Sequence, residues 1–166
     1  MTIFTLGSSL PLIKIEEDNV ISSITPKISF RYNPTDMKNH SSTSRTINAD
    51  NIFSLNRLGI GDSYEAGRSL TIGVDYKKES LDDVDKFFEF KLSTVLRDKF
   101  EPDIPVSSTL NRKNSNIFGS VTNKFSDFVK VDYNFALDND INTFEYNSIN
   151  TQFSVNNFVT EFKFIE

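Results

Sequence analysis

Two groups of side chains in this sequence could bind a metal ion or support catalysis. His40 is the single histidine, and it has no Cys or Ser-Asp partner at a metal-binding or catalytic spacing. Asp82, Asp83 and Asp85 could bind a divalent cation, but they lack the alternating oxygen ligands and closing Glu of an EF-hand. We interpret both groups as parts of solvated polar loops.

Two further groups suggest phosphate binding or acid–base chemistry. The run LGIGDSYEAGRS is similar to a phosphate-binding loop only in its glycines, since no Lys-Ser/Thr follows. We interpret these residues as turn glycines: Gly59, Gly61 and Gly67. Three glutamates could pair as acid and base, but no spacing brings two of them together: Glu65, Glu89 and Glu145. The sequence therefore predicts no enzyme, no cofactor and no metal site.

The composition favours a folded, β-rich chain. Of the 166 residues, 37% are hydrophobic and 13% aromatic, which is too much apolar surface for a disordered chain. The aromatic residues are 16 Phe and 5 Tyr, which suit pleated strands. Charges of both signs are interspersed around a net charge of -5, so we expect no nucleic-acid partner. The absence of cysteine excludes disulfides and thiolate metal sites.

Apolar and polar residues alternate with period 2 in segments of about ten residues. The alternation is clearest over residues 129–137, and it recurs over 70–76, 24–32 and 86–97. Short polar turns at 126–127, 138–140 and 156–157 separate the later segments. These features predict an all-β fold, an antiparallel up-and-down meander of about eight strands in one domain, residues 1–166.

The alternation changes parity inside one of these segments. Phe144 and Tyr146 alternate on even positions, whereas Ile149 and Phe153 alternate on odd positions. A β-bulge inserts one extra residue and would account for the change. We place it near residues 147–148.

The connections differ in length in a way that is typical of outer-membrane barrels. Two long polar loops are expected at residues 33–50 and 98–114, while the other turns are short. Strands of about ten residues that alternate also suit a bilayer crossing. We therefore expect one face to meet lipid: Leu70, Ile72, Val74, Tyr76, Val129, Val131, Tyr133 and Phe135. We expect the other face to line a wet lumen: Arg31, Glu89, Lys91, Lys130, Asp132 and Asn134.

Several runs carry a resemblance to a known family. They are Leu10-Pro11-Leu12, TPKISFRYNP at 25–34, NIFSLNRL at 51–58 and SLTIGVDY at 69–76, with Asp62, Glu65 and Gly67 between the last two. Together they resemble the LPS-assembly outer-membrane protein family, the LptD family, and the similarity continues through residues 115–119 and the closing hairpins. The second and third runs are distinctive as a pair.

The resemblance implies a large transmembrane β-barrel in the cell outer membrane of Gram-negative bacteria. Such a barrel receives lipopolysaccharide from a periplasmic bridge and inserts it into the outer leaflet, with a plug lipoprotein inside. The implied partners are lipopolysaccharide, these two proteins and membrane lipid. The family's signal peptide and periplasmic domain have no counterpart in the sequence, so we expect an internal fragment.

Two other classes of protein share the alternating pattern. A different outer-membrane channel or porin would show the same alternation and loop asymmetry, and only the paired runs argue against it. A soluble extracellular β-sandwich that acts as a binding module would also alternate, but with its apolar face buried. Both remain alternatives on sequence alone.

Overall fold

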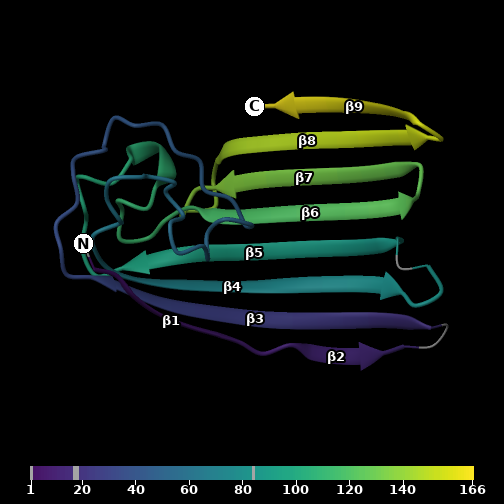
Figure 1. The fold of residues 1–166 in the computed structure, drawn as a ribbon, viewed down its shortest axis with the longest axis horizontal. Helices are drawn as coiled ribbons and strands as arrows, with labels where there is room; N and C mark the ends of the chain where they lie inside the picture. The colour runs from purple at the N-terminus through teal and green to yellow at the C-terminus, as the bar shows by residue number, and fades with distance from the viewer. Residues whose placement is uncertain (1, 17–18, 84) are drawn as a thin grey trace.

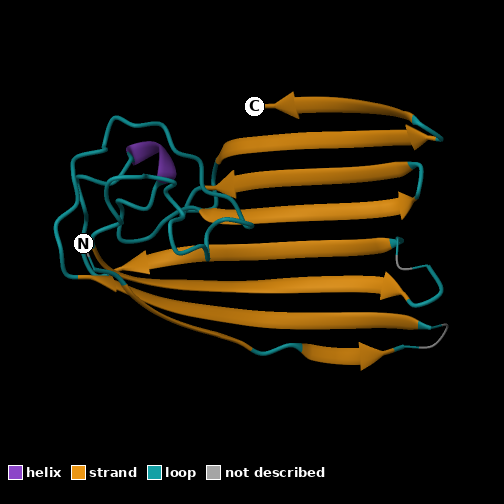
Figure 2. Ribbon diagram, in the orientation of Figure 1, coloured by secondary structure: helices purple, strands orange, loops and turns teal. Residues whose placement is uncertain are grey.

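The computed structural model describes residues 2–16, 19–83 and 85–166, and these residues form one antiparallel sheet (Figures 1 and 2). The predicted all-β meander is confirmed. The strands found among the described residues are β1 (Phe4–Ser9), β2 (Leu12–Ile15), β3 (Val20–Asn33), β4 (Gly67–Ser80), β5 (Phe87–Arg97), β6 (Ile117–Ser126), β7 (Val129–Leu137), β8 (Phe144–Val155) and β9 (Phe158–Ile165).

Each strand from β3 to β8 pairs with the next strand along the chain, which is the order of a meander. The edge beside β3 is formed by β1 and β2 in succession, because both pair with β3 along its length. A single 3-10 turn at Val106–Ser108 is the helical element of the described chain. No helix among the described residues is long and apolar enough to cross a membrane.

The connections at the two ends of the sheet differ in size. At one end, residues 34–66 join β3 to β4, and residues 98–116 join β5 to β6; both segments fold together beside the sheet (Figure 1). We call these two segments the loop cap. At the other end, tight turns at 127–128 and 156–157 join neighbouring strands. The first long loop therefore continues well beyond the expected range of 33–50, through the whole NIFSLNRL run.

The two faces of the sheet have opposite character, and the register shows that each is continuous. Ile28 pairs with Ile72 on the apolar face, while Ser29 pairs with Thr71 on the polar face. Ile28 and Ile72 are 47% and 42% exposed, whereas Thr71 is 2% exposed. A sheet of a soluble sandwich buries its apolar face, so the exposure seen here is inverted.

The hydrophobic core lies between the loop cap and the polar face of the sheet. Ile52, Ile104 and Leu110 of the loop cap are fully buried, as is Val95 of β5. Strand residues with short or polar side chains form the other side of this layer, so the sheet contributes few large apolar groups to the core. The members of the core cluster are Met37, Ile47, Ile52, Leu58, Ile60, Ala66, Val95, Ile104, Leu110, Phe118 and Ala136.

The β-bulge lies two residues before the predicted position. Leu137 pairs with Phe144 and Ala136 pairs with Tyr146, so Glu145 is the extra residue. Phe144 and Tyr146 consequently point to opposite faces, and their expected common face is wrong. The physical reason is that Glu145 is turned toward the loop cap, where it accepts a hydrogen bond from Asn116 (2.7 Å). A second, unpredicted irregularity places Phe125 outside the ladder between β6 and β7.

Candidate functional site

The residues expected to line a lumen lie on one face of the sheet. The pairing register connects Glu89 to Asp132 through Thr122, and Lys91 to Asn134 through Ser120. Arg31 lies on the same face of β3, next to Ser69 of β4. Lys130 follows on β7, two residues before Asp132. The polar face is therefore the candidate functional surface, with the loop cap over one end.

The residues expected to meet lipid lie on the opposite face. Tyr76 connects to Tyr133 through Phe90 and Val121, and Val74 connects to Phe135 through Leu92 and Gly119. Because side chains alternate across a strand, the remaining members of both sets follow on this face: Leu70, Ile72, Val129 and Val131. No described segment packs over this face.

The polar face carries paired charges along its strands. Lys91 contacts Glu89 (3.1 Å) and Lys130 contacts Asp132 (3.0 Å), in each case two residues along the same strand. The other pairs on this face are Lys27–Asp75, Lys77–Glu79 and Lys163–Glu161. Opposite charges in alternation leave this surface hydrated and without a strong field of either sign.

A buried ionic cluster joins the loop cap to the sheet. Glu65 of the loop cap is contacted by Arg57 (2.5 Å, Nη2 to Oε1), by Arg97 of β5 and by Arg31 of β3 (3.5 Å). The four side chains are at most 4% exposed. One carboxylate therefore stands among three guanidinium groups in the interior.

The remaining donors of these arginines hold both the loop and the strands. Arg57 donates to the hydroxyls of Ser69 (3.0 Å) and Thr71 (2.9 Å) on β4. Arg31 donates to the carbonyl of Ser54 (2.6 Å), and Arg97 donates to the carbonyl of Ala66. Such extra hydrogen bonds are what allow buried ion pairs to offset their desolvation.

The environment of Glu65 keeps it ionised. Burial raises the pKa of this carboxyl, but the charge and hydrogen bonds of Arg57, followed by Arg97 and Arg31, outweigh burial and lower the pKa to about 2. At neutral pH the cluster therefore has one negative and three positive groups. Glu65 has a structural role here, and we see no substrate-accessible acid–base pair around it.

Glu65 was predicted as an acid–base candidate and as one of the residues that carry the family resemblance, but the cluster was not predicted. A signal was nevertheless present in three of the runs that carry the family resemblance. Two of these runs each contain an arginine of the ionic cluster, and the third contains two hydroxyl residues that accept hydrogen bonds from Arg57. Arg31 lies in TPKISFRYNP, Arg57 lies in NIFSLNRL, and Ser69 and Thr71 lie in SLTIGVDY. The runs that carry the family resemblance are thus the ones that attach the loop cap to the sheet.

Comparison with known protein families identifies the family of the chain. The family model described as "LptD: LPS transport system D" matches residues 3–164, which is nearly the whole chain. The chain belongs to the LptD family. A search of curated proteins found no match to the chain.

A second contact between loop cap and sheet in this LptD-family chain involves an aromatic ring over a glycine. A Cβ built on Gly73 of β4 would lie 2.9 Å from Cζ of Phe53, so the ring occupies the space that a side chain would need. The ammonium of Lys27 lies 5.7 Å from the centre of the same ring. Nearby, Asp50 accepts from Lys91 (2.8 Å). These contacts hold residues 50–53 against the polar face.

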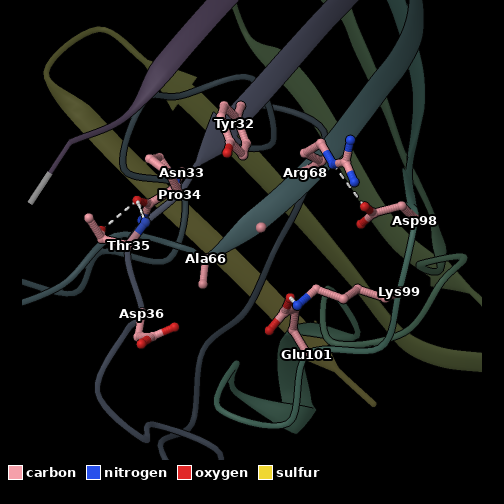
Figure 3. A pocket seen from close by; sticks show the side chains of 11 residues that line it. Tyr32, Asn33, Pro34, Thr35, Asp36, Ala66, Arg68, Asp98, Lys99 and Glu101 are labelled. Carbon is pink, nitrogen blue, oxygen red and sulfur yellow. Dashed lines mark hydrogen bonds and ion pairs between the residues drawn. The ribbon is translucent and has the colours of Figure 1, made fainter.

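A pocket of about 340 Å³ opens at the loop-cap end of β3, β4 and β5 (Figure 3). Its rim carries the Arg68–Asp98 pair (2.9 Å) and the Lys99–Glu101 pair (3.0 Å). Asp36 approaches from the opposite side (Figure 3). The charged groups of this pocket are largely paired with one another, so it carries no assigned ligand.

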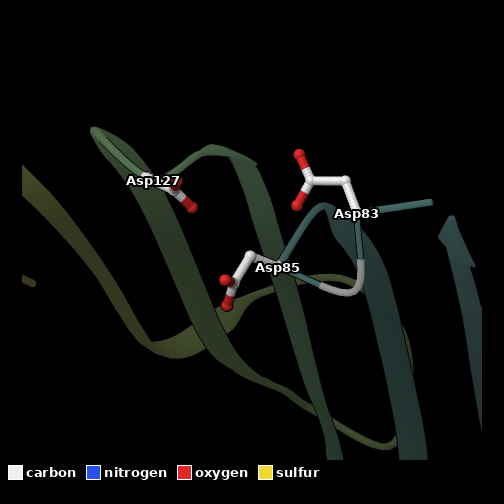
Figure 4. Close-up of side chains that lie close together, drawn as sticks. All are labelled: Asp83, Asp85 and Asp127. Carbon is white, nitrogen blue, oxygen red and sulfur yellow. The ribbon is translucent and has the colours of Figure 1, made fainter. Parts of the chain in front are cut away.

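The remaining candidates from the sequence are solvated ion pairs. Asp83 and Asp85 lie near Asp127 at the short-turn end (Figure 4), but Lys86 contacts Asp83 (2.8 Å) and Lys124 contacts Asp85 (2.6 Å). The two lysines offset two of the three negative charges in this group. The other two candidates are likewise engaged in ordinary polar contacts, His40 with Asp62 (3.0 Å) and Asp82 with Asn19 (3.1 Å).

Proposed function

We propose that this chain forms part of the wall of an outer-membrane β-barrel that transports lipopolysaccharide and inserts it into the outer leaflet. The observation that carries the proposal is the inverted sheet, with an exposed apolar face and a polar face covered by the loop cap. Membership of the LptD family supports the transport role. The apolar face then contacts membrane lipid, and the polar face lines the interior.

The family is described as part of a transport system, which favours transport over catalysis. The polar face offers paired charges and hydroxyls that can exchange hydrogen bonds with sugars. Both long loops lie at one end, and every connection at the other end is short, so we place the loop cap on the extracellular side. The plug lipoprotein and the periplasmic bridge are the partners that we infer from the family.

Adjacent residues on opposite faces of β7 provide the test. A photo-crosslinking amino acid is placed at Asp132 or at Val131 in the full-length protein in cells, and the crosslinked lipid is identified by immunoblotting and mass spectrometry. We expect lipopolysaccharide at position 132 and phospholipid at position 131. Absence of lipopolysaccharide from position 132, together with equal labelling at both positions, would contradict the proposed function.

A further inference from the structure

The apolar face of β4 is bounded by a basic residue at each end. Arg68 lies at the loop-cap end and Lys78 at the short-turn end, and the residues on this face between them are Leu70, Ile72, Val74 and Tyr76. Both basic side chains are well exposed, at 62% and 47%. The strand therefore shows a sharp change from apolar to charged at two points on the same face.

The distance between these two points matches the thickness of a membrane. Lys78 lies ten positions after Arg68. A strand rises about 3.3 Å per residue, which gives roughly 33 Å along the strand. Barrel strands are tilted by about 35–45°, so the separation along the membrane normal is roughly 23–27 Å. The apolar band of outer-membrane barrels is about 25 Å tall.

On the apolar face, the row at the short-turn end of β2, β3 and β4 carries two lysines. Lys14 of β2 and Lys78 of β4 are both register partners of Ser22, so the three side chains form a row on the apolar face. Glu16 accepts from Ser22 (2.9 Å) and contacts Lys78 (3.2 Å). Glu16 therefore pairs with Lys78, while the ammonium of Lys14 in the same row is exposed.

We propose that Lys14 and Lys78 bind the phosphate of an anionic glycerophospholipid at the short-turn edge of the apolar face, while Arg68 reaches the opposite headgroup plane. The occupant of the face between them is the acyl-chain layer. Lysine side chains at such a boundary extend their ammonium groups toward the headgroups while their methylenes stay in the apolar layer. The inference rests on the proposed function and adds the depth and direction of the chain in the bilayer.

Depth measurements along β4 test the position of the boundaries. Because the sequence has no cysteine, single cysteines can be introduced for nitroxide labels at positions 68, 70, 72, 74, 76 and 78 of the full-length protein in phospholipid vesicles. We expect oxygen accessibility to peak between 72 and 74, and accessibility to a water-soluble nickel chelate to rise toward 68 and 78. Water exposure of all six labels would overturn the proposed function as well, whereas an apolar maximum displaced to 68 or 78 would overturn only this inference.

Lipid selectivity tests the phosphate site. Spin-labelled phosphatidylglycerol and spin-labelled phosphatidylcholine are compared for association with the reconstituted protein. We expect the preference for phosphatidylglycerol to fall by about fivefold for each of K14A and K78A. The matched control is K77A, which removes the neighbouring lysine on the polar face and should leave the preference unchanged. Unchanged selectivity in K14A/K78A, or an equal loss in K77A, would overturn the site.

Discussion

The guanidinium of Arg57 donates to both carboxylate oxygens of Glu65, with N–O distances of 2.7 and 2.5 Å. Both residues belong to the 34–66 loop, yet the other donors of Arg57 reach two hydroxyls of β4. The bidentate Arg57–Glu65 pair fixes the orientation of the loop relative to the sheet, because planar bidentate pairs restrict geometry more than single contacts do.

Removal of the carboxylate should release the loop cap. In Glu65→Ala, three buried guanidinium groups lose their counter-ion, and breaking a buried pair in this way costs about 3–5 kcal/mol. Trypsin cleavage of the native protein at Lys38 and Arg45, both in the loop cap, measures the change. Asp98→Ala is the control, because its exposed pair with Arg68 contributes about 0–1 kcal/mol. Equal cleavage in both variants would contradict a central role for Glu65.

The loop cap should also loosen in acid. The pKa of Glu65 is about 2 in the folded chain, below its ordinary value of 4.5, so its contribution is present above pH 4.5 and is lost as the pH falls toward 2. The full contribution is about 3 kcal/mol. Near-UV circular dichroism of the tyrosines between pH 6 and 2 follows the change. The loss over this window should be smaller in Glu65→Gln; an identical pH profile would assign the acid sensitivity to other carboxyl groups.

A side chain at position 73 should displace the ring of Phe53 and so destabilise the loop cap. In Gly73→Ala the new methyl group would lie 2.9 Å from the ring and 3.0 Å from the carbonyl oxygen of Leu92. Overpacking of this kind costs about 1–3 kcal/mol, measured as an increase in trypsin cleavage of the loop cap. Gly61→Ala is the control because nothing lies within 4 Å of its Cβ position. The added variant Phe53→Ala should relieve part of the effect; additive losses would show that the ring and the methyl group do not compete.

A charge in the middle of the apolar face should oppose membrane insertion. Val74→Arg places a guanidinium near the middle of the apolar stretch between Arg68 and Lys78, and arginine at the bilayer midplane costs about 2–4 kcal/mol. Asn134→Arg places the same group on the polar face and should cost little. Urea titration of the protein folded into phospholipid vesicles compares the two. Equal destabilisation by both variants would contradict the assignment of the faces.

The strands were predicted well from the sequence because successive side chains of a strand lie on opposite faces, so apolar–polar alternation shows the face of each residue. Leu70 to Tyr76 on one side and Thr71 to Asp75 on the other follow from period 2 alone, and so does the opposition of Val131 and Asp132. The bulge was displaced because a change of parity shows that an extra residue exists without fixing its position. The extra residue is Glu145, whose carboxylate accepts hydrogen bonds from Asn116 and Arg112, and both of these lie far away in the sequence.

The loop cap could not be derived in the same way. Residues 34–66 have no periodicity, since their side chains are arranged by contacts with distant parts of the chain. Glu65 meets Arg31 and Arg97, which are 34 and 32 residues away. The composition predicts that such a loop is polar. It does not predict which acidic and basic residues pair over long range, because many combinations are possible.

The place of Arg97 at the end of β5 sets an order of events during folding. Glu65 precedes β4, so its arginine partner from β5 is synthesised later and arrives only when β5 has paired along β4. Contacts between such distant residues form late, after the loops between them have closed. A chain with β5 unpaired therefore lacks one of the three arginines around Glu65, and pairing of β5 completes the attachment of the 34–66 segment. We expect the segment to be most resistant to proteases only after that step.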